Sequence, residues 1–161
     1  MIKGDIVYLH LELCELDFKL KISNWISTTL DEDWTKNWCE VELELHSKYV
    51  NYEISGEILI SGEVTNLRDV LSDMLCGEMK DNQTLKCLEP DLRFDFKPSA
   101  EELVIIVTFW DGRVPRNSLM TMLKRSEIEA LYIYLKLVTG EISRDDDAVV
   151  KLIDAQVLVE E

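Results

Sequence analysis

The chain has 161 residues, of which 47% are hydrophobic and 30% are charged, a composition typical of globular proteins and not of disordered ones. This length predicts a single domain over residues 1–161 with a core that needs no disulfide or metal. Acidic residues outnumber basic ones by 32 to 17, so the net charge is −15 at pH 7. That charge argues against binding to nucleic acids or anionic membranes, which require a basic surface. Composition alone therefore indicates a soluble acidic domain and no particular function.

The cysteines and the N-terminal residues predict a cytoplasmic protein. The four cysteines are Cys14, Cys39, Cys76 and Cys87, and they form no C-x-x-C pair. Each lies in an apolar run, which favours buried structural thiols over disulfides or a zinc site. The first residues, MIKGDIVYLH, carry charges every few positions and lack the apolar stretch of a signal peptide. The longest apolar run, 103–110, is too short to span a membrane.

Alternating hydrophobicity predicts four strands in the first sixty residues. Two of them lie in residues 5–22, and a polar loop at 23–37 separates them from the third. In the third strand every second residue is apolar, from Cys39 to Leu45, so Glu40, Glu42 and Glu44 point to the opposite face in a row. The fourth strand forms an antiparallel hairpin with the third and places five apolar residues on one face: Val50, Tyr52, Ile54, Ile58 and Ile60.

The period then changes to that of a helix. Apolar residues at helical spacing predict helices at about 63–76 and 127–139, which end at Gly77 and Gly140. A capping box of Ser126 and Glu129 is expected at the start of the second helix. Between the helices we expect a strand from about residue 85, broken at Pro90 and resumed to residue 96, a central strand at 103–110, and a further strand at 116–124.

These elements predict an α+β fold, in which a mostly antiparallel sheet has two main helices packed on one face. The tail is ambiguous, because the aspartates at 145–147 suit a helix N-terminus while the last 13 residues contain four valines, which suit a strand. A third helix in the tail is the favoured interpretation.

The sequence contains no catalytic motif. His10 and His46 occupy strand positions without a nucleophile in a recognised arrangement, and the glycine pattern forms no phosphate-binding loop. A metal-assisted hydrolase could use the acidic runs 31–33 and 145–147, but these lack the spacing of a calcium loop and suit a solvated surface better. We therefore expect no enzyme activity, no catalytic residue, no cofactor and no metal.

The negative charge is concentrated in two regions. Residues 31–63 contain nine acidic residues against Lys36 and Lys48, and residues 141–161 contain seven against Arg144 and Lys151. Residues 64–140, with twelve acidic and ten basic residues, are nearly neutral. Regional acidity is typical of a surface that attracts a basic partner, although solubility and the protection of a sheet edge would explain it as well.

Tryptophans flank the acidic strand and make it a candidate partner-binding surface. Trp25 and Trp34 precede the strand, and Trp38 falls on the same face as the glutamates by strand parity. Exposed tryptophan is common at the centre of protein interfaces, while a loop tryptophan can equally cover a core. The candidate partner-binding residues are Asp31, Glu32, Asp33, Trp34, Trp38, Glu40, Glu42 and Glu44.

One motif and the order of the elements resemble a known family. The sequence Glu89-Pro90-Asp91-Leu92, followed by Phe94 and Phe96, is similar to the E-P-[ND]-L-x-F-x-[FL] strand of the WapI-like immunity proteins. The resemblance covers roughly residues 38–142. From its own chemistry the motif is structural: Pro90 marks a sheet edge or a bulge, and Glu89 can accept backbone N–H groups or pair with Arg93.

The resemblance implies a function, since immunity proteins are bacterial antidotes that bind and block toxins. It implies a non-enzymatic protein that blocks a cognate toxin, and an acidic surface suits a basic toxin such as a nuclease. The alternative is a structural or regulatory module that binds a partner or self-associates, for example as a homodimer, through the edge of the hairpin or the tail.

Overall fold

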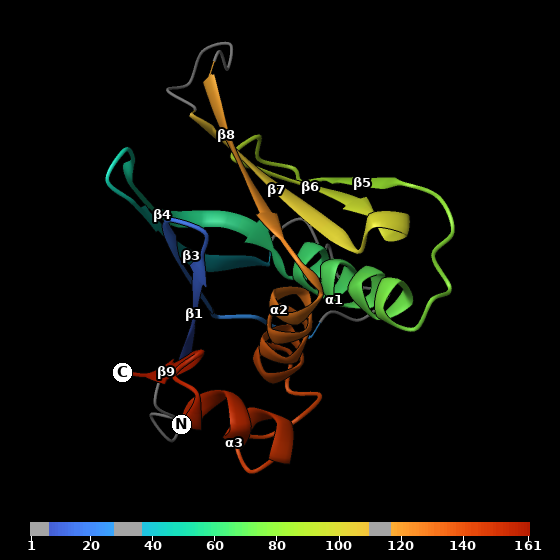
Figure 1. Ribbon diagram of the computed structural model, residues 1–161. Coiled ribbons are helices and arrows are strands. Elements are labelled where there is room, and N and C mark those ends of the chain that lie inside the picture. The colour runs from blue at the N-terminus through green and yellow to red at the C-terminus, as the bar shows by residue number, and fades with distance from the viewer. Residues whose placement is uncertain (1–6, 28–36, 110–116) are drawn as a thin grey trace.

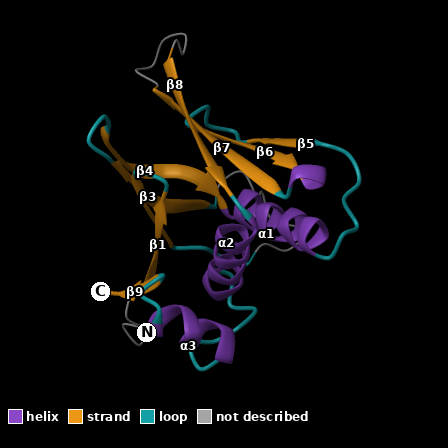
Figure 2. Cartoon of the chain, viewed as in Figure 1, coloured by secondary structure: helices purple, strands orange, loops and turns teal. Residues whose placement is uncertain are grey.

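The computed structural model describes residues 7–27, 37–109 and 117–161, whose strands form two antiparallel sheets (Figures 1 and 2). The order is β4-β3-β2-β1-β9 in the five-stranded sheet and β5-β6-β7-β8 in the four-stranded sheet. The strands are β1 (Val7–Leu13), β2 (Leu16–Ser23), β3 (Trp38–His46), β4 (Asn51–Ile60), β5 (Gln83–Lys86), β6 (Leu92–Lys97), β7 (Glu102–Phe109), β8 (Asn117–Leu123) and β9 (Leu158–Glu160). The helices are α1 (Ser61–Leu75), α2 (Arg125–Val138) and α3 (Asp147–Asp154), with a 3₁₀ turn at Pro98–Ala100.

The predicted α+β class with mostly antiparallel strands is confirmed, and the strands are divided between two sheets where one was expected. The division occurs at Ser61, where α1 follows β4 without a connecting loop. The chain therefore leaves the first sheet through a helix and starts a second sheet beyond it. Helix α2 contacts strands of both sheets, namely β1, β7 and β8.

The five-stranded sheet follows the predicted alternation, with one correction in β4. Leu20 of β2 lies between Leu9 of β1 and Leu43 of β3, and all three side chains are buried. The register between β3 and β4 shifts at Cys39/Glu40, where β4 contains an extra residue. Because of this bulge, Leu59 lies opposite Cys39 on the inner face, which corrects the prediction that Ile60 shares a face with Ile54.

The four-stranded sheet contains the central strand that was predicted from residues 103–110. β7 lies between β6 and β8, and residues 103–107 are buried on both faces of the sheet. The break expected at Pro90 is a reversal of the chain, since β5 and β6 pair antiparallel with Lys86 opposite Arg93. Pro90 therefore lies in a hairpin loop and not in a bulge within one strand.

Helices α1 and α2 occupy the predicted regions and end before Gly77 and Gly140, whose φ angles are +78° and +72°. The capping box predicted from Ser126 and Glu129 is wrong. Helix α2 begins at Arg125, and the carboxylate of Glu127 accepts the backbone N–H of Lys124 at 3.3 Å.

The tail contains both of the elements that its composition suggested. Asp146 caps α3 by accepting the N–H of Ala148 at 2.9 Å, which confirms the favoured third helix. The chain then turns at Gln156 and forms β9, which pairs with β1 through Leu9 and Leu158. The tail thus adds the fifth strand to the first sheet (Figure 1).

One hydrophobic cluster joins the two sheets and the helices. It includes Val64 and Leu71 of α1 and Leu131 and Leu135 of α2, and all four side chains are fully buried. The inward residues of both sheets belong to the same cluster. Since the inner faces are covered in this way, the outer faces and the free edges of the sheets remain for interactions.

A buried tyrosine hydroxyl joins α2 to the five-stranded sheet. The ladder between β1 and β2 extends from Leu13–Leu16 only as far as Leu9–Leu20. Beyond that pair the hydroxyl of Tyr134 accepts the N–H of Ile22 at 2.9 Å and donates to the carbonyl of Val7 at 3.1 Å. One side-chain group therefore satisfies two backbone groups where the strands separate, and its burial raises the pKa of Tyr134.

Replacing this hydroxyl should destabilise the protein. We expect Tyr134→Phe to lower the free energy of unfolding by about 1–3 kcal/mol, because the backbone groups of Val7 and Ile22 lose their partner. Urea denaturation measures the change. Tyr132→Phe on the same helix is the matched control, since among the described residues the Tyr132 hydroxyl has no hydrogen-bond partner. Equal effects of the two substitutions would contradict the bridging role.

Candidate partner-binding face

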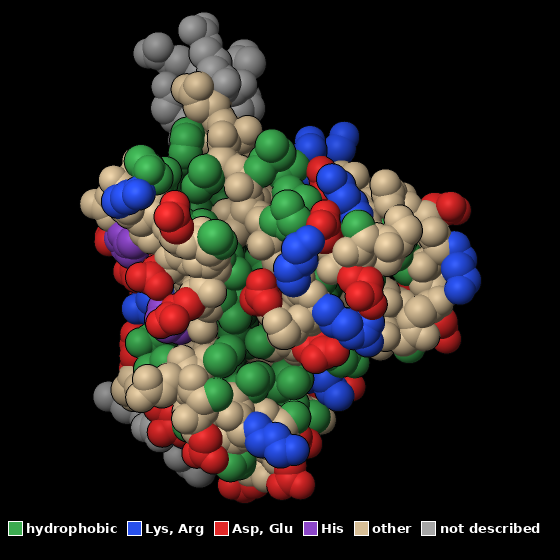
Figure 3. Space-filling model, in the orientation of Figure 1, with side chains coloured by type: hydrophobic (Ala, Val, Ile, Leu, Met, Phe, Trp, Pro, Cys, Tyr) green, Lys and Arg blue, Asp and Glu red, His purple; other side chains and the backbone are tan. Residues whose placement is uncertain are grey.

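The outer face of the five-stranded sheet presents the glutamate row that the sequence predicted. Glu40 and Glu42 are exposed and Glu44 is half-buried, while the residues between them point into the core. β4 adds Glu53 and Glu57, both exposed, to the same face. In Figure 3 acidic side chains lie along the left edge of the molecule, where Figure 1 shows β3 and β4. We call these five residues, Glu40, Glu42, Glu44, Glu53 and Glu57, the acidic face.

Carboxylates oppose one another directly across the β3–β4 pair. Glu40 lies opposite Glu57 and Glu44 lies opposite Glu53, with Ser55 opposite Glu42 between the two pairs. Like charges in directly opposed positions of an antiparallel pair destabilise a sheet. The acidic face therefore has an electrostatic cost within the free protein, and a cationic partner would relieve it.

Lysines of β2 neutralise part of this face. Lys19 and Lys21 lie opposite Glu44 and Glu42, and each pair has an N–O distance of 3.6 Å. Lys21 also contacts Glu161 at 2.8 Å, and this hydrogen bond raises the pKa of Lys21 and lowers that of Glu161. These pairs were not predicted from the sequence, although the alternation of residues 18–22 places both lysines on the outer face.

The other opposed pair is less neutralised. Within the described residues, Glu40 and Glu57 form no ion pair with a lysine or arginine. A surface hollow of about 360 Å³ lies instead beside the Glu44–Glu53 pair. It is lined by Glu42, Glu44, Glu53, Ile54 and Ser55. The uncompensated negative charge is therefore concentrated at the Glu40–Glu57 end of the face.

A cluster that sequence reasoning missed lies at the opposite end of the face. Donor atoms of Glu44, His46 and Glu53 lie within 4.8 Å of one another, and His46 Nε2 is 3.4 Å from a carboxylate oxygen of Glu53. Such a group could hold a divalent cation. Its side chains are solvent-accessible and Glu44 already pairs with Lys19, so ion pairing among these side chains accounts for the arrangement.

Four of the other candidate residues lie outside the described residues, namely Asp31, Glu32, Asp33 and Trp34. Trp38 is half-buried opposite Ile60. Trp25 donates its indole N–H to the carbonyl of Ser61 at 3.1 Å, so it anchors the segment after β2 to the start of α1. Trp25 is thus a structural residue.

The remaining polar residues that the sequence singled out have structural partners. Asp146 caps α3, and His10 lies 3.6 Å from Asp17 across the β1–β2 pair. All four cysteines are free; Cys39 is buried and Cys87 half-buried, but Cys14 and Cys76 are exposed, which corrects the expectation of four buried thiols. None of the helices in residues 7–27, 37–109 and 117–161 is long and apolar enough to cross a membrane.

The Glu-Pro-Asp-Leu motif is held by a residue that the sequence did not indicate. The carboxylate of Glu63, at the start of α1, accepts the backbone N–H groups of Ile60 and Leu88, and burial raises its pKa. Arg93, one of the partners considered for Glu89, pairs instead with Asp95 at 3.2 Å. The motif therefore forms a loop fixed to helix α1.

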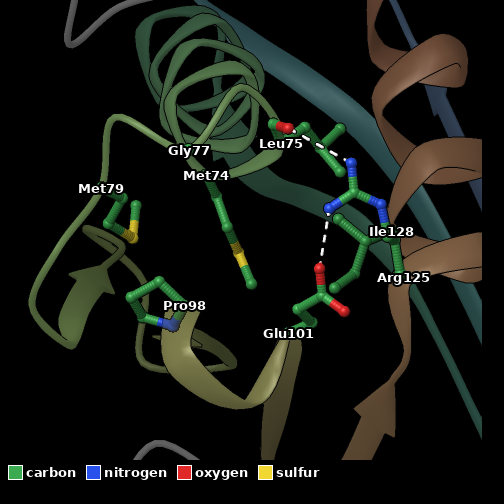
Figure 4. A pocket seen from close by; sticks show the side chains of 8 residues that line it. All are labelled: Met74, Leu75, Gly77, Met79, Pro98, Glu101, Arg125 and Ile128. Atoms are coloured by element: carbon green, nitrogen blue, oxygen red, sulfur yellow. Dashed lines mark hydrogen bonds and ion pairs between the residues drawn. The ribbon is translucent and has the colours of Figure 1, made fainter.

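The small cavity shown in Figure 4 has no free polar group for a ligand. Its volume is about 130 Å³, and methionine, proline and aliphatic side chains form much of its wall. Arg125 crosses the opening, where its guanidinium pairs with Glu101 at 2.9 Å and donates to the carbonyl of Leu75 at 3.3 Å. The charged groups of the cavity thus pair with each other. Arg125, at the start of α2, connects that helix to the end of α1.

Asp91 generates a prediction about pH. Asp91 as a whole residue is only 9% exposed, and burial raises the pKa of its carboxyl above the ordinary value of 3.8. A carboxyl with a raised pKa favours the folded state when protonated and disfavours it once the pH exceeds the raised value. We therefore expect Asp91→Asn to be more stable than the unmodified protein at pH 7.

The advantage of Asp91→Asn should disappear as the pH falls well below the ordinary value of 3.8, where the carboxyl is protonated in both the folded and the unfolded state. Urea denaturation across this pH range measures it. Asp81→Asn, which removes a charge from an exposed loop, serves as the control. A stability difference that does not change with pH would show that burial of the Asp91 charge is not its source.

Comparison with known proteins agrees with the motif. A family model described as the Immunity protein WapI-like family matches residues 6–145. The match extends from β1 through α2 and ends before α3 and β9. It confirms the resemblance stated from residues 38–142 and extends it to the first strands. No curated protein matches the chain.

Proposed function

This chain belongs to the WapI-like immunity protein family, and we propose that it binds a cognate toxin and blocks it through the acidic face. The observation that carries this proposal is the pair of opposed carboxylates Glu40 and Glu57, which have no basic partner among the described residues. A free protein gains no stability from opposed like charges. A cationic surface bound across them would turn this repulsion into attraction.

The chemistry of the face suggests what kind of toxin it fits. A nuclease binds phosphate groups through a basic surface, and a sheet face with exposed carboxylates at regular spacing presents a similar distribution of negative charge. Such a face would also accelerate association, because attraction between opposite charges steers two proteins together. The proposed mechanism is therefore occlusion of a basic active site, with no chemical step by the immunity protein.

The place of action follows from the same proposal. An antidote must meet its toxin inside the cell that it protects, and four free thiols suit a reducing compartment. We therefore place the protein in the bacterial cytoplasm.

The proposal is tested by capturing the partner and measuring its activity. The purified chain is used as bait in a lysate and in the secreted fraction of the source bacterium at low and at high salt. We expect a basic polypeptide that is retained at low salt, released at high salt and inhibited by the chain in an activity assay. A captured toxin that is acidic, or that binds independently of salt, would contradict the acidic face as the binding site.

The double variant Glu40→Gln/Glu57→Gln tests the site itself. We expect it to slow association with the captured toxin by about tenfold or more at low salt, because steering depends on these charges. Stopped-flow fluorescence measures the rate. The variant should fold at least as stably as the unmodified protein, since it removes a like-charge pair.

The control variant for this test is Glu78→Gln/Asp81→Asn. It also removes two negative charges, but from the exposed segment between α1 and β5. It should leave the association rate nearly unchanged. Equal effects of the two double variants would mean that net charge, and not the acidic face, governs association.

A further inference from the structure

In the described part of the chain, two open sheets leave four edge strands, and three of these are protected against pairing with another chain. β4 carries Glu53 and Glu57, as well as the bulge near Cys39. β5 has four residues and includes Lys86, and β9 has only three residues, the last of which is Glu160. Charges, bulges and short length are the usual means by which proteins keep sheet edges from associating.

The fourth edge, β8, has none of these protections. It has seven residues, NSLMTML, none of them charged, although charged residues make up 30% of the chain. It lies at the edge of the four-stranded sheet, and Figure 1 shows it in front of β7. Within the described part of the chain, the backbone of β8 pairs with β7 alone.

The outer face beside this edge is apolar. Met120 and Met122 of β8 are 70% and 48% exposed. They lie opposite Ile106 and Val104 of β7, which are only 8% exposed, so apolar side chains extend across both strands. In Figure 3 hydrophobic side chains gather over this part of the molecule, below the grey atoms. An uncharged edge next to exposed apolar side chains is a surface suited to strand pairing.

We propose that β8 pairs with β8 of a second copy of this chain, forming a symmetric dimer with one continuous sheet across the two molecules. The charge of the region around β8 favours a second copy of this chain as the partner. A basic partner would instead be attracted to the acidic face. Residues 64–140 contain twelve acidic and ten basic residues, so two copies of this highly negative protein repel each other least through this region. Antiparallel strands related by a twofold axis meet through identical surfaces, as a closed dimer requires.

The dimer should respond to salt in the opposite sense to toxin binding. Two copies with a net charge of −15 repel each other, and salt screens that repulsion. We therefore expect sedimentation equilibrium of the purified chain to show a mass that rises with concentration from 18.7 kDa toward twice that value, more readily at high than at low salt. A single 18.7 kDa species up to about millimolar concentration at both salt levels would overturn the proposal.

Substitution of an exposed side chain on β8 locates the interface. Met120→Lys places a charge on the edge and should weaken dimerisation by about tenfold or more, whereas Met120→Leu should preserve it. Tyr49→Lys is the matched control, since Tyr49 is 76% exposed in the β3–β4 turn and the charge change is the same. A dimer dissociation constant that Met120→Lys leaves unchanged, or that Tyr49→Lys raises equally, would overturn the assignment to β8.

The two proposals can fail separately. The sedimentation experiment uses this chain alone, so a monomeric result says nothing against toxin binding. Conversely, loss of toxin binding in Glu40→Gln/Glu57→Gln leaves β8 unchanged. Met120→Lys should weaken the dimer while keeping a normal thermal unfolding transition, which distinguishes loss of the interface from loss of the fold.

Discussion

The contact of helix α2 with both sheets is the constraint on which their arrangement depends, and the hydroxyl of Tyr134 is its polar part. A phenol hydroxyl can donate and accept at once, so it can bridge a backbone N–H and a backbone carbonyl where two strands separate. Helix α2, which carries Tyr134, also contacts β7 and β8 of the other sheet. The bridge therefore fixes the five-stranded sheet to the helix against which the four-stranded sheet packs.

That arrangement separates the two outward surfaces by their chemistry. The inner faces of both sheets belong to one hydrophobic cluster, so the surfaces left for partners are the outer faces and the edges. The five-stranded sheet presents opposed carboxylates, and the four-stranded sheet presents an uncharged edge with exposed methionines. As proposed, binding of a cationic protein to the first surface would be weakened by salt, while dimerisation through the second would depend on apolar contact and backbone pairing. The same chain can thus use both without competition between them.

Part of this protein could be predicted from local pattern. The period-2 alternation of residues 39–45 places the glutamates outward, because successive side chains of a strand point to opposite faces. Helical spacing of apolar residues located α1 and α2, and the Glu-Pro-Asp-Leu motif indicated the immunity family that the match to residues 6–145 shows. The exact start of α2 was not predictable in the same way, since Ser126 and Glu127 are both suitable capping residues and only packing decides between registers.

By itself, then, the sequence determined the element types, the α+β class, the family and the outward direction of Glu40, Glu42 and Glu44. These follow from local periodicity and composition, which depend on neighbours in the chain. Only the tertiary structure decided that there are two sheets, that Lys19 and Lys21 neutralise Glu44 and Glu42, that Glu57 opposes Glu40, and that β8 is an unprotected edge. Each of these depends on strand order and register, which arise from contacts between residues far apart in the chain and leave no local pattern.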